Sequence, residues 1–201
     1  MSKIPVEYFR NPDTLWLARD LIGKHLLYRD SNDIIRGGII TETEAYLGAN
    51  DRASHAWGNR KTKRTSTMFL PGGVAYVYLC YGIHHLLNIV TAERDIPHAI
   101  LIRGIYAITE THIRNQHAKN TFSAWLDGPG KLTKALGITT ALDKTPLTGD
   151  TLWLEPSRVE VPQSLISTTP RIGVDYAAED ALLPYRFCIN NPQAFENLLN
   201  K

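Results

Sequence analysis

The stretch IIRGGIITETEAY, residues 34–46, decides the fold class. Apolar and polar residues alternate toward its end, and it is rich in β-branched residues, which together indicate a β-strand. The turn residues Ser31-Asn32-Asp33 precede it, and a second apolar run, His25–Tyr28, precedes the turn. Two runs of this kind around a short polar turn predict an antiparallel hairpin.

The rest of the chain extends this pattern. Asn11-Pro12-Asp13 starts an apolar-periodic stretch that Gly23 ends, which predicts a helix. The later strands cluster as hairpins without regular βαβ alternation, so we expect one α+β domain over residues 1–201 with a curved, mainly antiparallel sheet and flanking helices. Strands are predicted at Val74–Tyr81, Leu86–Val90, Ala99–Tyr106, Thr151–Leu154, Arg171–Val174 and Arg186–Ile189, and helices at Ala107–His117, Pro129–Leu136 and from about Gln193.

The composition is that of an ordinary globular protein, with 43% hydrophobic and 21% charged residues in 201. Cys80 and Cys188 are too few and too far apart for a disulfide framework, so we expect reduced core thiols. The start, MSKIPVEYFR, has no apolar signal region, and no run approaches the ~18 apolar residues of a membrane span. We therefore expect a cytoplasmic protein with no membrane partner.

A basic loop stands out although the net charge is only +2. Between Asp51 and Thr65 five basic residues face one acid. Such a loop suits a polyanion, and charge alone is equally typical of a solvated loop. The candidates for contact with a DNA backbone are Arg60, Lys61, Lys63 and Arg64, with Lys131 farther along the chain.

Glu42 and Glu44 stand two apart in the strand at residues 34–46, so both carboxylates lie on one face, about 6.5–7 Å apart. Two carboxylates on one face suit hydrolysis of a glycosidic bond. The same spacing is also typical of a strand face that is simply exposed to solvent. Ile39 and Ile40 precede the pair and indicate that the strand is partly buried. Burying a carboxylate costs free energy unless the group is paired or hydrogen-bonded, so its presence there calls for an explanation.

Aromatic residues form a second candidate feature. Tyr76, Tyr78 and Cys80 share one face of their strand, and Tyr81 follows just before Gly82. Aromatic side chains beside a basic loop can stack on bases, while strands also favour tyrosine for structural reasons alone.

Three other chemistries are disfavoured. Gly128-Pro129-Gly130-Lys131 resembles the end of a phosphate-binding loop, but Trp125 stands where the upstream glycine is required, although a helix starting at Pro129 could offer its amides to a phosphate. His84-His85 has no second cluster that would complete a metal site. The zinc-deaminase signature is absent. We therefore expect neither a metal nor a cofactor.

Seven segments in order resemble the alkyladenine (3-methyladenine) DNA glycosylase family, in its bacterial type. They span residues 18–189, nearly the whole chain, and the ordered set is highly specific although no single segment is. The segments are ARDLIGKHLL, GGIITETEAYLGANDRASHAW, TMFLPGGVAYVYLCYGIHHLLNIV, AILIRGI, DGPGKLTKALGI, TPRIGV and YRFCI.

The resemblance implies a monofunctional glycosylase that hydrolyses damaged purines from duplex DNA as a monomer. Glu44 resembles the base that activates water, and Arg103 the arginine near that water. Glu42 has no catalytic counterpart and is expected to act as a structural partner on the same face. The implied substrates are 3-methyladenine and 7-methylguanine, and also hypoxanthine and ethenoadenine.

The resemblance also assigns the base pocket and a hairpin that enters the minor groove. Tyr46, His55 and Tyr78 resemble the walls that stack on an extruded base, which must leave the duplex before it can be attacked. Asn88 resembles the residue that disfavours the 2-amino group of guanine. Tyr81 resembles the wedge that fills the gap left in the base stack.

Two rival interpretations differ in what they require. A non-catalytic nucleic-acid binder with the same fold needs no Glu44 in a pocket. A hydrolase of free nucleosides or sugars, acting through Glu42 and Glu44 as a pair, needs neither Tyr81 nor DNA.

Overall fold

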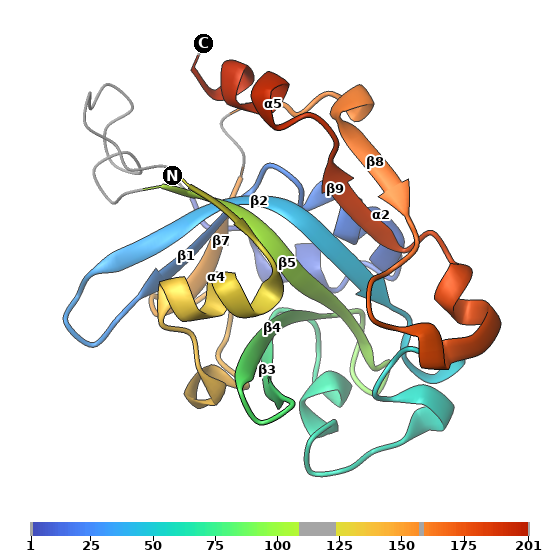
Figure 1. The fold of residues 1–201 in the computed structure, drawn as a ribbon. Helices are drawn as coiled ribbons and strands as arrows, with labels where there is room; N and C mark the ends of the chain where they lie inside the picture. Colours follow the sequence, from blue (N-terminus) through green and yellow to red (C-terminus); the bar gives the residue numbers. More distant parts are fainter. Residues whose placement is uncertain (1, 109–123, 157–158, 201) are drawn as a thin grey trace.

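Two long antiparallel strands, β2 (Ile35–Tyr46) and β5 (His98–Ile108), form the centre of the sheet in the computed structural model (Figure 1). The structure describes residues 2–108, 124–156 and 159–200. The main path through the sheet is β3-β4-β5-β2-β1-β7; β6 pairs with β5, and β9 pairs with both β2 and β8. The other strands are β1 (His25–Arg29), β3 (Ala75–Cys80), β4 (His84–Thr91), β6 (Ala124–Asp127), β7 (Leu152–Glu155), β8 (Ile166–Thr169) and β9 (Arg186–Ile189).

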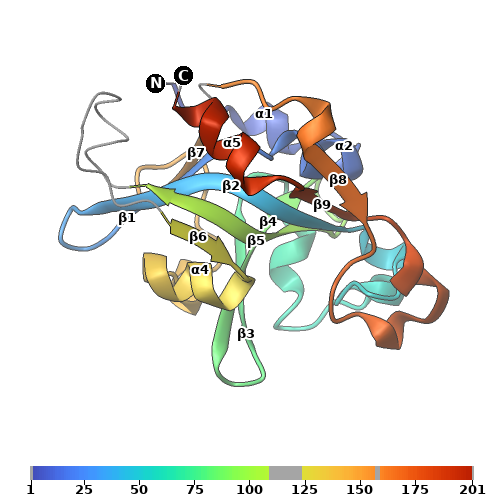
Figure 2. The ribbon, with the colours of Figure 1, turned by 45° about the horizontal axis from the view of Figure 1, so that its top comes forward.

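Strand β2 changes its neighbour along one edge, and this change shapes the site. β1 pairs with Ile35–Ile39, whereas β9 pairs with Glu42–Glu44. The register with β5 on the other edge shifts on both sides of Glu42. Such a bulge bends a strand and increases its twist. The sheet accordingly curls strongly (Figure 2), and its irregular point coincides with the two carboxylates singled out in the sequence.

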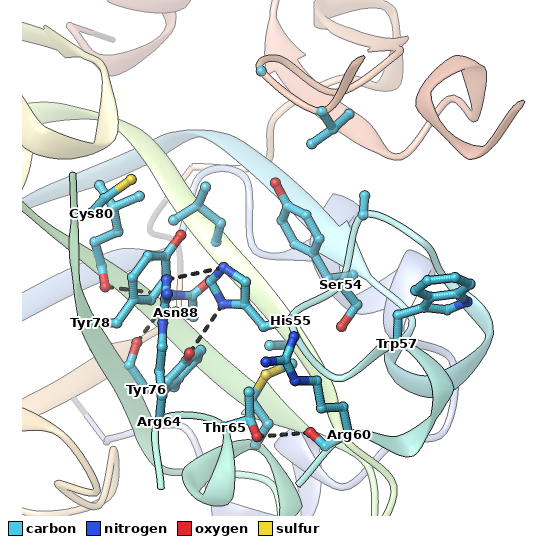
Figure 3. Close-up of a pocket in the computed structure, with 18 of the residues that line it drawn as sticks. Ser54, His55, Trp57, Arg60, Arg64, Thr65, Tyr76, Tyr78, Cys80 and Asn88 are labelled. Carbon is cyan, nitrogen blue, oxygen red and sulfur yellow. Dashed lines mark hydrogen bonds between the residues drawn. The ribbon is translucent and has the colours of Figure 1, made fainter. Parts of the chain in front are cut away.

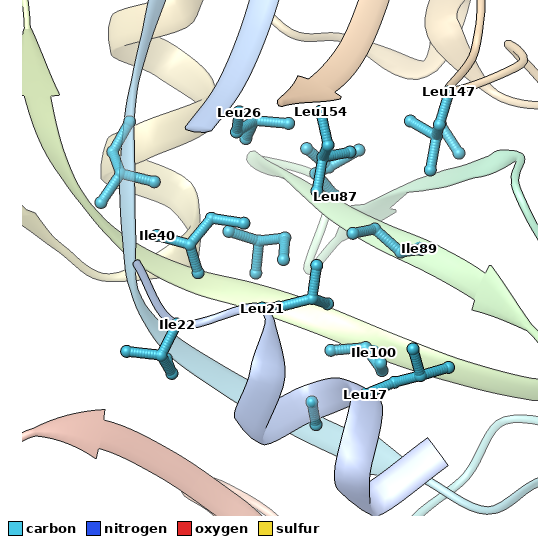
Figure 4. Packing of buried hydrophobic residues seen from close by; sticks show 14 of the residues in the cluster. Leu17, Leu21, Ile22, Leu26, Ile40, Leu87, Ile89, Ile100, Leu147 and Leu154 are labelled. Carbon is cyan, nitrogen blue, oxygen red and sulfur yellow. The ribbon is translucent and has the colours of Figure 1, made fainter. Parts of the chain in front are cut away.

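The core lies where helix α2 (Thr14–Asp20) packs on the sheet. The helix begins directly after the predicted start signal Asn11-Pro12-Asp13, where the Asp13 side chain accepts a hydrogen bond from the amide of Trp16 at 2.9 Å. Burial stabilises each large apolar side chain by roughly 1.5–3 kcal/mol. Figure 4 shows Leu17, Leu21, Leu26, Ile40, Leu87, Ile89, Ile100, Leu147 and Leu154 meeting in this core.

Further helices are α1 (Val6–Phe9), α4 (Pro129–Leu136) and α5 (Pro192–Leu199), with short 3₁₀ turns at Gly48–Asn50, Trp57–Asn59, Ser66–Phe69, Thr140–Leu142, Gln163–Leu165 and Asp175–Leu182. The predicted α+β class with a curved antiparallel sheet is confirmed. In the described ranges, none of the helices has the length and apolarity that crossing a bilayer requires.

Several sequence predictions need correction. The predicted strand Arg171–Val174 is wrong, because Gly173 takes a left-handed φ of 76° and the segment turns; the strand in this region is β8. The helix predicted at Ala107–His117 is wrong at its first two residues, which belong to β5, and from residue 109 it lies outside the described residues. Strand β6 had no clear signal in the sequence.

The two cysteines are free thiols, as expected, but each is only half-buried rather than part of the core. Among the residues that the structure describes, no group of three or more metal-ligating side chains could hold an ion.

Candidate active site

The Glu44 carboxylate is fully buried near the end of β2 and is surrounded by donors. Its Oε1 accepts a hydrogen bond from the amide of Ile172 at 2.8 Å, and its Oε2 accepts one from the Tyr46 hydroxyl at 2.8 Å. Arg103 Nε lies 3.4 Å from Oε1. Burial raises the pKa of the Glu44 carboxyl, and Arg103 and the two donors oppose part of that rise. A carboxylate tuned in this way suits general-base work.

Glu42 lies on the same face and joins two arginines. Its Oε1 accepts hydrogen bonds from Arg103 Nε at 3.0 Å and from Arg186 Nε at 2.6 Å. Arg186 reaches Glu42 because β9 pairs with β2 at this point. Arg103 is therefore held between both carboxylates. The predicted common face of the two glutamates is confirmed, and the structural role expected of Glu42 takes the form of these arginine pairs.

Next to these groups lies a cavity of about 850 Å³ (Figure 3). That volume is in the usual range for small-molecule sites. Tyr46, Arg103 and Ile172, the three contacts of Glu44, all contribute to its wall, and Glu44 itself lies behind them.

One wall of the cavity is aromatic. The rings of Tyr76 and Tyr78 in β3 are 5.3 Å apart, and the His55 ring meets that of Tyr78 edge-on at 4.7 Å. His55 Nδ1 lies 3.1 Å from the Tyr76 hydroxyl. Burial, and then the positive charge of Arg64, lower the pKa of His55 to about 4, so the imidazole is neutral near pH 7. The wall thus presents flat, uncharged rings.

Asn88 is buried on β4 directly opposite Tyr76 and also lines the cavity. Its Nδ2 donates a hydrogen bond to the carbonyl oxygen of Tyr76 at 3.1 Å, which fixes the amide plane at the base of the aromatic wall. Tyr46, His55, Tyr78 and Asn88 therefore all reach the same cavity.

The hairpin between β3 and β4 protrudes from the sheet (Figure 2). Its tip lies beside the cavity and carries exposed apolar side chains. Tyr81 is 92% exposed and Ile83 is 70% exposed. Tyr81 and Gly82 both have positive φ, and the amide of Ile83 closes the turn on the carbonyl oxygen of Cys80 at 3.1 Å. This turn matches the right-handed twist of hairpin strands and holds Tyr81 outward.

Comparison with known proteins identifies the family of this chain. A family model described as methylpurine-DNA glycosylase matches residues 7–193. A protein of Chlamydia felis is 40% identical over 190 residues, which cover 93% of this chain and 96% of that protein. A protein of Bacillus subtilis is 40% identical over 193 residues, which cover 94% and 93%. Both relatives carry the name "putative 3-methyladenine DNA glycosylase". The chain belongs to the methylpurine-DNA glycosylase family.

For a member of this family, the basic residues are of special interest. Arg60 and Arg64 line the cavity, and Lys63 is exposed. Lys61 pairs with Asp95 at 3.3 Å and lies over the ring of Phe69. Lys131 lies on α4 and pairs with Asp127 at 2.7 Å. Four of the five predicted backbone contacts therefore come from the loop beside the pocket, and Lys131 comes from a separate element.

The sequence did not reveal what holds Glu44 and the pocket wall in place. Arg171 is buried with Asp51, its Nη1 and Nη2 lying 2.5 and 2.9 Å from the two carboxylate oxygens. The guanidinium also donates to the Ala45 carbonyl oxygen at 2.9 Å and lies over the Tyr46 ring at 4.8 Å. This ion pair positions the turn whose Ile172 amide binds Glu44. The sequence signal for this ion pair was the position of Arg171 within the largely uncharged segment TPRIGV.

Proposed function

We propose that this chain is a monofunctional DNA glycosylase that hydrolyses the bond between deoxyribose and a damaged purine, leaving an abasic site. The observation that carries the proposal is the buried Glu44 carboxylate directly behind an aromatic cavity. The names of the relatives support 3-methyladenine as a substrate.

Glu44 acts as the general base that takes a proton from the attacking water. The carboxylate has no solvent contact in the DNA-free protein, so water must take the place of one of its three polar contacts, the hydrogen bonds from Ile172 and Tyr46 or the ion pair with Arg103. The contact with Arg103, at 3.4 Å, is the longest of them, whereas Ile172 and Tyr46 each donate at 2.8 Å. The water therefore enters between Glu44 and Arg103. Glu42 limits how far Arg103 moves, because it holds the same Nε at 3.0 Å.

The pocket binds the extruded purine by stacking. Purines alkylated at N3 or N7 carry a positive charge, and tyrosine faces attract cations by ~0.5–2 kcal/mol. A cationic base is also a good leaving group, so a base acting on water suffices for it. We assign Asn88, which is buried in the wall and hydrogen-bonded to the Tyr76 carbonyl oxygen, the role of opposing the 2-amino group of guanine. Hypoxanthine and ethenoadenine are further substrates that the stacking wall can accept.

Water rather than an amine is the nucleophile in this proposal. Among the described residues that line the cavity there is no lysine. A lyase reaction needs an amine to form a Schiff base with the sugar. The reaction therefore ends at the abasic site.

The proposal is tested with duplexes that each contain one lesion, with an undamaged duplex and the matching free nucleosides as controls. We expect base release from the 3-methyladenine duplex and none from the undamaged duplex or the nucleoside. Release from the free nucleoside at a similar rate would instead support the rival hydrolase. Tight binding without release from any lesion would support the non-catalytic binder.

The exposed Tyr81 side chain is proposed to fill the gap that the extruded base leaves. Replacing Tyr81 by alanine should weaken binding to lesion duplex by roughly 1–3 kcal/mol, the range for removal of one aromatic stack. Fluorescence anisotropy measures that binding. The control is Ile34→Ala, which removes a 44% exposed apolar side chain beside the β1–β2 turn. Equal affinities of the Tyr81 variant and wild type would rule out the wedge.

Lys61 and Lys63 are proposed to contact phosphates, together with Arg60, Arg64 and Lys131. Changing Lys61 and Lys63 to glutamate should lower affinity for all sequences alike and reduce the slope of log K against log salt by about 1 for each phosphate that is no longer neutralised. Titrations at several salt concentrations measure the slope. Lys3→Glu is the control, because Lys3 lies over the ring of Trp153 in β7, at the opposite end of the sheet from β3. An unchanged slope in the double variant would show that this loop does not touch the backbone.

A further inference from the structure

Arg64 has an unusual position for a residue expected at a DNA backbone, because its side chain turns to the aromatic wall of the pocket (Figure 3). Its guanidinium carbon lies 4.7 Å from the centre of the Tyr78 ring, and its Nη2 lies 3.2 Å from His55 Nε2. A guanidinium over a tyrosine face is a cation–π contact.

The contact with Arg64 also fixes the protonation of His55. An arginine only donates, so His55 Nε2 must be the acceptor and the ring proton must sit on Nδ1. Nδ1 then donates to the Tyr76 hydroxyl, 3.1 Å away. His55 thus holds a lone pair toward the position that Arg64 occupies.

The other arginines deep in the site differ from Arg64 in their partners. Arg103 and Arg186 bind Glu42, and Arg171 binds Asp51. In the described part of the chain, no carboxylate lies within ion-pair distance of Arg64, whose contacts include Tyr78 and His55. Its side chain is exposed, whereas the adjacent Thr65 is buried and its hydroxyl donates to the Arg60 carbonyl oxygen at 2.8 Å. The backbone here is anchored while the side chain is held only by the pocket.

We propose that Arg64 is a placeholder in the base pocket: its guanidinium covers the stacking face of Tyr78 in the free protein and is displaced by the extruded base. This inference rests on the proposed function, since it takes the cavity as the base pocket. A guanidinium is a flat cation, as is a purine alkylated at N3 or N7, so both suit the same ring face. To bind, a base must gain more free energy by stacking on the wall than is lost when the Arg64 guanidinium leaves it.

Displacing Arg64 costs the same free energy for every base. The cost changes occupancy of the pocket most for a base whose extruded and stacked states have similar free energies, because a base that already binds strongly stays in the pocket either way. Undamaged bases pay the full cost of unpairing, which is smaller for damaged ones. Arg64 thus shortens the time that a normal base spends in the pocket, and acts as a specificity residue without contacting the reacting atoms.

The first test needs no ligand and follows the His55 ring protons by NMR during a pH titration. The charged and titratable groups facing this ring are Arg64, Tyr76 and Tyr78. The pKa of His55 is about 4 with Arg64 in place. In Arg64→Ala the positive charge is gone and water reaches the ring, so the pKa should rise toward 6.5, the usual value for histidine. Arg94→Ala removes the same charge at an exposed position just after β4 that does not line the cavity, and it should leave the pKa unchanged.

The second test titrates free 3-methyladenine, which carries no phosphate, into the three proteins. Arg64→Ala should bind the base about two- to fivefold more tightly than wild type, the range for removal of one exposed cation–π competitor. Arg94→Ala should bind it as wild type does, because Arg94 does not line the cavity. A phosphate-only role for Arg64 predicts no change in base affinity.

The outcomes separate this inference from the function on which it rests. Equal or weaker base binding by Arg64→Ala, or an unchanged His55 pKa in that variant, overturns the placeholder role. If the pKa of His55 rises in Arg64→Ala but none of the three proteins binds the base, the cavity is not a base pocket. The placeholder role is then also wrong, because it depends on that pocket.

Discussion

Replacing Glu44 by glutamine is expected to reduce base excision by about 10²–10⁴-fold, the contribution of a general base, while DNA binding survives. Glutamine keeps an oxygen that can accept from the Ile172 amide, so the local structure is preserved while the proton acceptor is removed. Single-turnover release of 3-methyladenine from a duplex measures the chemistry, and anisotropy measures the binding.

Glu42→Gln is the matched control, since it changes a carboxylate on the same strand face. Its remaining oxygen can still accept from Arg103, so the loss of activity should be smaller than at Glu44. Near wild-type excision by Glu44→Gln would contradict the assignment of the base. A larger loss at Glu42 would transfer the role to that residue.

The pH profile gives an independent check on Glu44. In the proposed mechanism the ionised carboxylate is the active form. Burial raises its pKa above 4.5, so kcat/KM should fall as pH falls through a value above 4.5. His55 does not produce this limb, because its pKa is about 4 and the ring stays neutral at higher pH. The acidic limb should be absent from the residual activity of Glu44→Gln.

Asp51→Asn is expected to have the largest effect on stability, lowering the free energy of unfolding by about 3–5 kcal/mol. The side chains of Arg171 and Asp51 are 0% and 2% exposed, so the variant leaves a buried guanidinium without its counter-charge. Asp51 also accepts hydrogen bonds from the amides of Leu47 and Ala53, each at 3.0 Å. Urea denaturation followed by circular dichroism measures the change.

Glu179→Gln is the control for this variant, because it breaks an ion pair with Arg52 in the same region. Those side chains are 71% and 40% exposed, so the loss of stability should stay below about 1 kcal/mol. If Asp51→Asn cost no more than Glu179→Gln, the buried pair would not be what holds the turn at Ile172.

The parts of the fold that could be predicted from sequence are those set by local pattern. The alternation in residues 34–46 located β2, and Asp13 marked the start of α2 because a cap is a local interaction. The spacing of Glu42 and Glu44 placed both carboxylates on one face, where they share Arg103.

The rest depends on contacts between distant segments. Spacing could not choose between Glu42 and Glu44, because burial and the Ile172 amide, 128 positions away, distinguish them. The pattern at Arg171–Val174 resembles a strand, yet its arginine is drawn into an ion pair with Asp51, 120 positions away. The position of Arg64 over Tyr78 likewise follows from how the basic loop folds back on β3.

The proposed reaction removes the base from DNA by hydrolysis and leaves the strand intact. The most direct test is a duplex with one 3-methyladenine and an end label, incubated with the enzyme and then analysed with and without hot alkali. We expect free base in both samples, with strand cleavage only after alkali. Cleavage without alkali would reveal a lyase step, and an intact strand with no free base after alkali would contradict the claim altogether.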